Sequence, residues 1–90
     1  MQFEWNAVKA KSNLRKHGVS FEEASAVFYD ELSATGGDPD HSVGERRFIT
    51  IGVSSARRLL AVAHTDRDDV VRIVSARPAV PPERRIYEEG

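Results

Sequence analysis

A chain of 90 residues, 40% hydrophobic and 30% charged, has the size and composition of one globular domain and is too short for a second. It contains no cysteine, which excludes disulfides, thiolate metal centres and thiol nucleophiles. The net charge of −1 gives no overall attraction to nucleic acid, and no apolar run approaches the ~18 residues of a membrane span. We therefore expect a single cytoplasmic domain over residues 1–90 with no membrane contact.

The charges are distributed unevenly along the chain. Residues 1–20 carry a balance of +3, residues 21–45 carry seven acidic and no basic side chains, and residues 46–90 return to +3. Ten of the thirteen basic residues are arginines, whose planar guanidinium matches phosphate and carboxylate geometry. The pattern indicates either a basic face for an anionic partner or ordinary solvated charge, and composition leaves both open.

The first element after a weakly alternating strand at residues 1–5 is a helix. Asn6 is a typical N-cap, and Gly18 is a typical C-terminal residue in the left-handed conformation, so we predict a helix over residues 7–17. Its alanines and leucine form an apolar stripe, while its lysines and arginine lie on other surfaces.

A second helix is predicted directly after the first. Ser20 and Glu23 have the spacing of a capping box, and apolar residues follow at helical intervals to about residue 29. Residues 33–45 are rich in Gly, Asp, Pro and Ser and are predicted as a loop.

The second half of the chain changes to strand patterns. Residues 47–53 alternate, residues 59–64 form an apolar run, and residues 70–76 are rich in β-branched side chains, with short polar connections between them. These three strands predict an antiparallel meander, followed by a short helix near residues 83–87 that Pro82 begins.

The predicted fold class is α+β. Two N-terminal helices pack on one face of a small, mostly antiparallel β-sheet, and a short C-terminal helix follows. The other face is left to solvent or to a partner, and we expect function there.

The sequence lacks the motifs of most enzyme classes. His17, His41 and His64 lack the spacing of metal ligands, so we predict no metal site. A glycine-rich phosphate loop and a G-x-S-x-G nucleophile turn are also absent from the sequence, and we predict no cofactor.

Arg72 stands out because it interrupts an apolar strand. Its neighbours Val71 and Ile73 point to one face, so Arg72 points to the other. A charge in a central strand is costly to bury unpaired. Arg72 therefore either pairs with a carboxylate such as Glu22 or Glu45 in a folding role, or lines a functional site.

Further cations are predicted to gather with Arg72 in the folded chain. Metal-free RNA cleavage uses the RNA's own 2′-hydroxyl as nucleophile, so the protein supplies only a base, an acid for the 5′-oxygen and cations for the phosphate. The candidates that this topology brings near one another are Arg77, Arg58, Lys9, Lys11 and His17.

Several segments of the chain resemble the BrnT toxin family. The first helix pair carries an Asn-Leu-Arg-Lys-His-Gly-Val-Ser-Phe-Glu-Glu-Ala run, and the last strand carries Arg-Ile-Val-Ser-Ala-Arg. The similarity covers nearly the whole chain, in residues 3–6, 9, 13–24, 27–28, 45–48, 51–52, 72–77, 83–84 and 87–88.

The resemblance implies a bacterial ribonuclease toxin of a type II toxin–antitoxin system, with a RelE-like fold, that inhibits translation by cleaving RNA. It also implies neutralisation by a BrnA-type antitoxin, whose ribbon-helix-helix part contacts operator DNA, and repression of the operon by the complex. Matching positions suggest catalytic roles for Arg72, Arg77, Glu45 and His17, and RNA binding by Lys9. Arg58 and Lys11, which the predicted topology places beside them, are added as a catalytic and an RNA-binding candidate. The alternative is a module without enzymatic activity that binds the antitoxin and tunes repression.

Overall fold

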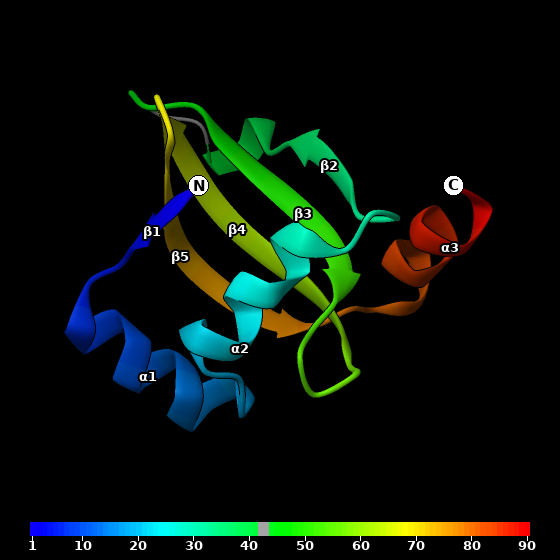
Figure 1. Ribbon diagram of the computed structural model, residues 1–90, viewed down its shortest axis with the longest axis horizontal. Helices are drawn as coiled ribbons and strands as arrows, with labels where there is room; N and C mark the ends of the chain where they lie inside the picture. Colours follow the sequence, from blue (N-terminus) through cyan, green and yellow to red (C-terminus); the bar gives the residue numbers. More distant parts are fainter. Residues whose placement is uncertain (42–43) are drawn as a thin grey trace.

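The computed structural model describes residues 1–41 and 44–90 (Figure 1). Among these residues, one five-stranded sheet, in the order β1-β5-β4-β3-β2, organises the fold. The elements are β1 (Gln2–Glu4), α1 (Ala7–His17), α2 (Phe21–Ser25), the 3₁₀ helix η1 (Ala26–Tyr29), β2 (Ala34–Gly37), the 3₁₀ helix η2 (Pro39–His41), β3 (Arg47–Val53), β4 (Leu59–Arg67), β5 (Val70–Pro78) and α3 (Pro81–Glu89).

The sheet is mixed. β3, β4 and β5 form the antiparallel meander that the sequence predicts, whereas β1 pairs with β5 in parallel. The prediction of a loop over residues 33–45 is wrong at residues 34–37, where β2 pairs antiparallel with β3, and at residues 39–41, which form η2. Residues 42–43 of that predicted loop lie outside the described residues. The sequence of β2, Ala-Thr-Gly-Gly, has little intrinsic preference for a strand, so pairing with β3 determines its conformation.

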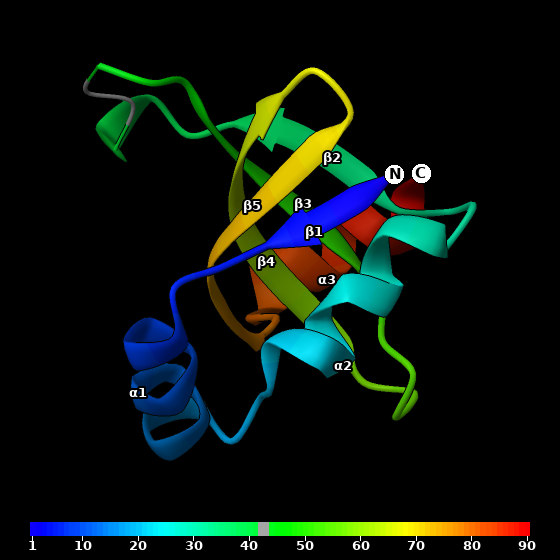
Figure 2. The ribbon, with the colours of Figure 1, turned by 60° about the vertical axis from the view of Figure 1, so that its left-hand side comes forward.

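The ends of α1 follow the predicted capping. The Asn6 side chain accepts hydrogen bonds from the amides of Val8 and Lys9, and Gly18 adopts a left-handed φ of 69°. The position of α1 differs from the expectation of two helices on one face. It lies at the edge of the sheet, beside the part of β5 that extends past β1 (Figures 1 and 2).

The core forms where α2 and η1 cover one face of the sheet. Ser20 caps α2 by accepting from the amide of Glu23 at 3.0 Å, and the helix tightens to 3₁₀ geometry at residue 26, within the single helix that the sequence predicts. The fully buried side chains include Phe21 and Val27 of these helices and Leu60 and Ile73 of the sheet. Their burial is the main stabilising contribution to the fold.

His64 is a buried polar residue of this core. Its Nε2 is 2.7 Å from the Thr50 hydroxyl and its Nδ1 is 2.7 Å from the Asp66 carboxylate, while Phe28 and Phe48 pack on the ring. Both ring nitrogens therefore have a partner, which removes the cost of burying the imidazole.

The C-terminal helix α3 lies on the opposite face of the sheet from α2 (Figure 2). The Tyr87 hydroxyl donates to Asp30 at 2.7 Å and ties α3 to the segment after η1. Burial raises the pKa of Asp30, but hydrogen bonds from Tyr87 and from two backbone amides bring it below its usual value. In the described parts of the chain, none of the helices is long and apolar enough to span a membrane.

Candidate functional site

The candidate site lies on the face of the sheet that points away from α2, which we call the open face. Cross-strand partners share a face of a sheet, and Arg72 pairs with Thr65, whereas Ile73 pairs with the buried His64. Arg72 therefore points away from the core, as the sequence predicts. The open face carries Arg47, Ile49, Ala61, Ala63, Thr65, Arg72, Ser75 and Arg77.

A β-bulge places both candidate arginines of β5 on the open face. In a regular strand, residues five positions apart point to opposite faces. Here Ile73 pairs with His64 and Ser75 pairs with Ala63, so Val74 has no residue opposite it. The extra residue reverses the alternation, and Arg77, paired with Ala61, joins Arg72 on the same face.

Arg77 lies in a pocket of about 240 Å³ at the centre of the open face. Glu83 of α3 accepts from both terminal nitrogens of Arg77, at 2.7 and 2.9 Å. This bidentate pair lowers the pKa of Glu83 and raises that of Arg77. The guanidinium therefore stays charged and held in one orientation, with its terminal nitrogens on an internal carboxylate.

The same pocket holds a histidine–aspartate pair, His41 and Asp38, that sequence patterns do not single out. His41 Nδ1 is 3.0 Å from an Asp38 carboxylate oxygen, and the His41 side chain is 64% exposed. An exposed imidazole oriented by a carboxylate can transfer protons near neutral pH. The sequence spacing, Asp followed by His three residues later, is the only sign of the pair, and it does not show that Arg47, Ser75 and Arg77 line the same pocket.

The cations of α1 border this pocket. Lys9, Lys16 and His17 line a groove together with Ser75, and Ser75 also lines the central pocket. The open face thus continues from Arg77 across Ser75 to the predicted candidates Lys9 and His17. Lys11 is exposed on α1 and is not among the side chains that line this groove.

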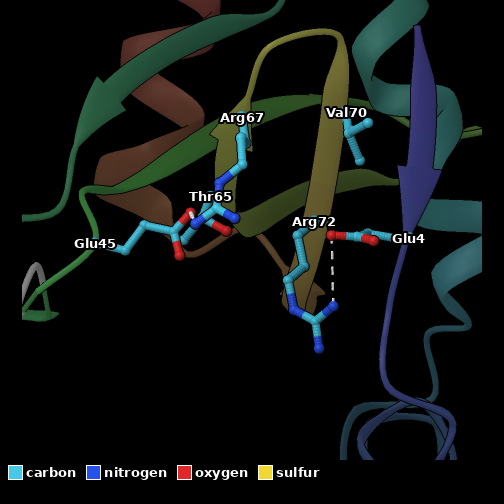
Figure 3. A pocket seen from close by; sticks show the side chains of 6 residues that line it. All are labelled: Glu4, Glu45, Thr65, Arg67, Val70 and Arg72. Atoms are coloured by element: carbon cyan, nitrogen blue, oxygen red, sulfur yellow. Dashed lines mark ion pairs between the residues drawn. The ribbon is translucent and has the colours of Figure 1, made fainter.

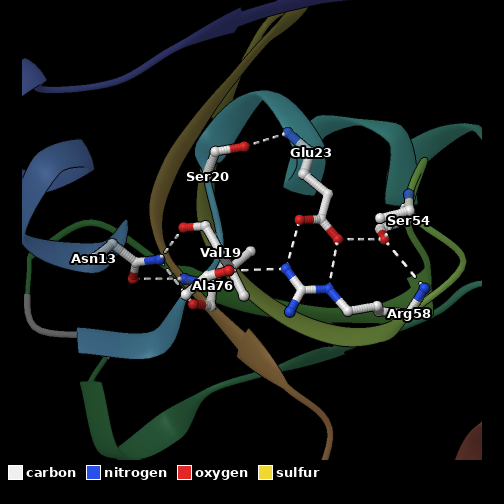
Figure 4. Close-up of polar contacts among 9 residues, drawn as sticks. Asn13, Val19, Ser20, Glu23, Ser54, Arg58 and Ala76 are labelled. Carbon is white, nitrogen blue, oxygen red and sulfur yellow. Dashed lines mark hydrogen bonds and ion pairs between the residues drawn. The ribbon is translucent and has the colours of Figure 1, made fainter. Parts of the chain in front are cut away.

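Asn13 fixes α1 at this position (Figure 4). Its amide nitrogen donates to the carbonyl oxygens of Val19 and Ala76, at 2.9 and 2.8 Å, and its amide oxygen accepts from the Ala76 amide at 3.0 Å. The side chain therefore pairs with the edge of β5 as a neighbouring strand would, and it satisfies backbone groups that are buried there.

Arg72 and Glu45 line a second pocket of the open face (Figure 3). The partner of Arg72 is Glu4 of β1, at 3.5 Å, and both side chains are about half exposed. This corrects the expectation that Glu22 or Glu45 would pair with Arg72. Glu45 instead lies 3.9 Å from Arg67.

Arg58 lies apart from these groups, on the side of the sheet that α2 covers (Figure 4). Its guanidinium donates to both carboxylate oxygens of Glu23, at 2.9 and 2.6 Å, and to the Gly18 carbonyl oxygen at 2.9 Å. Ser54 donates to the same carboxylate. The expectation that Arg58 joins Arg72 and Arg77 is therefore not met, because Arg58, the residue before β4, ties the connection between β3 and β4 to α2.

The chemistry available on the open face is cationic and acid–base. Oriented guanidinium groups bind phosphate oxygens, and an imidazole moves a proton at neutral pH. Within residues 1–41 and 44–90, no three His, Asp or Glu side chains are placed to hold a metal ion together.

Comparisons with known proteins agree on the identity of this fold. The model of the family described as the ribonuclease toxin BrnT of type II toxin–antitoxin systems matches residues 5–83. The 1.1 Å crystal structure of the ribonuclease toxin BrnT from Brucella abortus aligns with a TM-score of 0.65 at 25% identity, over 89% of this chain and 97% of that one. The curated protein sequences gave no match. The chain belongs to the BrnT family of ribonuclease toxins of type II toxin–antitoxin systems.

Proposed function

We propose that the open face binds RNA and cleaves it without a metal ion. The observation that carries this proposal is the bulge at Val74, which puts Arg72 and Arg77 on the face that α1 borders with Lys9 and His17. A cluster of cations on one face suits a phosphate backbone, even though the whole chain is close to neutral.

In the proposed reaction the 2′-hydroxyl attacks the adjacent phosphorus and the bond to the 5′-oxygen breaks. A base on the protein accepts the 2′-hydroxyl proton, and an acid gives a proton to the departing 5′-oxygen. The products are a 2′,3′-cyclic phosphate and a 5′-hydroxyl. Arg77 and Arg72 would stabilise the charge on the phosphate, and His17, His41 and Glu45 are the candidates for proton transfer.

The proposed partner is an antitoxin of the BrnA type with a ribbon-helix-helix DNA-binding part. In this proposal the toxin contacts operator DNA only through the antitoxin, and the complex represses its own operon. We also propose that the free toxin acts in the cytoplasm, inhibits translation by cleaving RNA and has the fold of the RelE toxins. Membership in a toxin–antitoxin family supports the existence of an antitoxin partner. The other parts of this proposal rest on the sequence resemblance to the BrnT family.

The test is cleavage of a labelled RNA by the purified toxin in EDTA. Arg77→Met should lower the rate by about 10²-fold, the scale for removing one oriented transition-state donor. Arg85→Met, at an exposed residue of α3, is the control and should cleave at the wild-type rate. RNA with a 2′-deoxy group at the cleaved position should resist cleavage. The proposal would be contradicted if Arg77→Met cleaved RNA at the wild-type rate and if the wild type cleaved the 2′-deoxy RNA as fast as the unmodified RNA.

A second candidate is a toxin-like module that binds the antitoxin and has no enzymatic activity. The internal ion pairs favour this second candidate, because Arg77 and Arg72 are already paired with Glu83 and Glu4 and are therefore less available to bind phosphate. Salt dependence separates the two functions. An RNA-binding enzyme releases counterions, so its RNA affinity falls steeply as salt is raised, whereas a module that binds only protein shows no such slope for RNA.

A further inference from the structure

β2 presents an unpaired strand edge. The Asp38 amide donates to the Arg47 carbonyl oxygen at 2.9 Å, which makes these two residues a hydrogen-bonded pair of the antiparallel ladder. Such pairs alternate, so Gly36 exchanges hydrogen bonds with Ile49, while the backbone N–H and C=O groups of Thr35 and Gly37 point outward. Among the described residues, no neighbouring strand pairs with that edge.

An apolar groove runs beside this edge on the open face. It has a volume of about 270 Å³ and lies between Ile49 and Ile51 of β3 and Ile86 of α3. Ile86 is 54% exposed, and a Cβ built on Gly36 would meet no atom within 4 Å. The groove is therefore open to an added side chain. Because successive side chains of a strand point to opposite faces, every second residue of a strand added to β2 would face the groove, and apolar side chains at those positions would fill it.

The charge around the groove favours a basic occupant. Residues 30–41 contain four acidic and no basic residues, and α3 contains three acidic and two basic ones. The two segments together therefore carry a charge of −5, and Arg46, whose guanidinium lies 4.0 Å from where a Cβ on Gly37 would be, lowers this excess to −4. A second copy of this chain would bring the same negative charge to the edge, which disfavours self-pairing through β2.

We propose that the antitoxin adds an extended segment to the outer edge of β2, with apolar side chains in the groove and Lys or Arg toward the acidic segments. Backbone hydrogen bonds to Thr35 and Gly37 would provide affinity, and the groove would provide specificity. The proposal rests on the antitoxin partner that the family implies and does not depend on ribonuclease activity.

This position gives the occupant access to the candidate site. Ile49 lines both the groove and the central pocket, and Glu83 lines the groove while holding Arg77. A bound segment would therefore cover the margin of the central pocket and hold α3 against Arg77. Neutralisation would follow from exclusion of RNA at this end of the open face.

The experiment uses the toxin co-expressed with the antitoxin encoded in its own operon. Gly37→Pro removes an N–H that points outward and leaves the ladder to β3 intact, because the φ of Gly37 is not positive and proline is tolerated on an edge strand. Ile86→Lys removes the apolar side chain that α3 contributes to the groove. Val8→Lys, at an apolar residue of α1 that is 76% exposed, is the matched control.

We expect Gly37→Pro and Ile86→Lys each to weaken antitoxin binding by about tenfold or more, and Val8→Lys to leave it unchanged. Melting curves of the free variants show whether each one is folded. In hydrogen exchange of the wild type, the amides of Thr35 and Gly37 should gain protection when the antitoxin binds, whereas Gly36 is protected in both states. The free Gly37→Pro and Ile86→Lys variants should keep the wild-type rate of RNA cleavage.

Four results would overturn this inference. Protection that appears on α1 and not on β2 would place the antitoxin on the other margin of the open face. A toxin dimer that protects the β2 edge without antitoxin would make a second copy the occupant. Full antitoxin affinity in both variants, or no antitoxin binding by the wild type, would reject the β2 edge as the docking site. None of these results bears on the ribonuclease activity, which the cleavage assay in EDTA tests separately.

Discussion

Glu83 holds Arg77 through two hydrogen bonds, at 2.7 and 2.9 Å, and the Glu83 side chain is 16% exposed. The pair joins α3 to the centre of the open face, and it also ties the candidate transition-state cation to an internal carboxylate. Glu83 has a second role, since it accepts from the Val80 amide at the start of α3. The Arg77–Glu83 pair therefore stabilises the start of α3 and also reduces the positive charge that the central pocket presents.

Replacing Glu83 by glutamine should release the Arg77 charge toward RNA. We expect Glu83→Gln to bind RNA several-fold more tightly at low salt. Because Arg77 is 38% exposed, the loss of stability should be about 1 kcal/mol. Filter binding and thermal melting on one preparation test both effects. Unchanged RNA affinity would mean that Arg77 does not contact RNA.

Arg72→Ala should separate activity from folding. The partner of Arg72 is the exposed Glu4, so losing the pair costs at most ~1 kcal/mol and leaves the melting temperature within a few degrees. RNA cleavage should fall by about 10²-fold. A variant that melts far below the wild type would show that Arg72 serves folding, and Arg77 would become the main candidate cation.

Asn13→Ala should be strongly destabilising. The substitution leaves the Ala76 amide and carbonyl groups and the Val19 carbonyl group buried without a partner, and each orphaned group costs about 1–3 kcal/mol. We expect a loss of about 3 kcal/mol in urea unfolding. Ser12→Ala, at an exposed neighbour on α1, should change stability by less than ~0.5 kcal/mol. Equal stability of the two variants would exclude the role of Asn13 at the β5 edge.

Gly52→Ala should destabilise the contact between η1 and β3. An added Cβ would lie 2.9 Å from Val27 Cγ1, closer than Cβ atoms come in folded proteins, and 3.2 Å from the Val27 carbonyl oxygen, which is tighter than most such contacts. The expected cost is about 1–3 kcal/mol, typical of overpacking. Gly36→Ala is the matched control, because its Cβ meets no atom within 4 Å. Chemical denaturation of the two variants should therefore give clearly different midpoints.

The fold should lose stability in acid in part through Glu23. Hydrogen bonds from Arg58 lower the pKa of Glu23 below its usual value of 4.5. A carboxylate with a lowered folded-state pKa contributes stability that is complete above the unfolded value and is lost as pH falls through the folded value. Melting temperature should therefore drop as pH is lowered from about 5 toward 3, and Glu23→Gln should be less stable at pH 7 with a shallower drop. Glu22→Gln, at an exposed site, should follow the wild type.

The sequence by itself determined the local elements of this protein. Asn6, Gly18 and Ser20 act on backbone groups within a few residues, so the helix starting at residue 7, its end at residue 17 and the start of the next helix could be read directly. Alternation and β-branched content likewise predicted β3, β4 and β5, because a strand's pattern reflects its own two faces. The family resemblance followed from the same helix pair and last strand.

The tertiary structure decided what depends on residues far apart in the chain. β2 is a strand because it pairs with β3. β1 pairs in parallel with β5, a strand nearly seventy residues later in the sequence, so this pairing depends on the fold of the whole chain. The bulge at Val74 is a register shift against β4, invisible in the sequence of β5, and it alone brings Arg72 and Arg77 to one face. Sequence patterns do not encode such partners, because side-chain pairing and strand register are chosen by the packing of the whole sheet. For this reason Arg58 pairs with Glu23, whereas His41 and Asp38 come to lie beside Arg77.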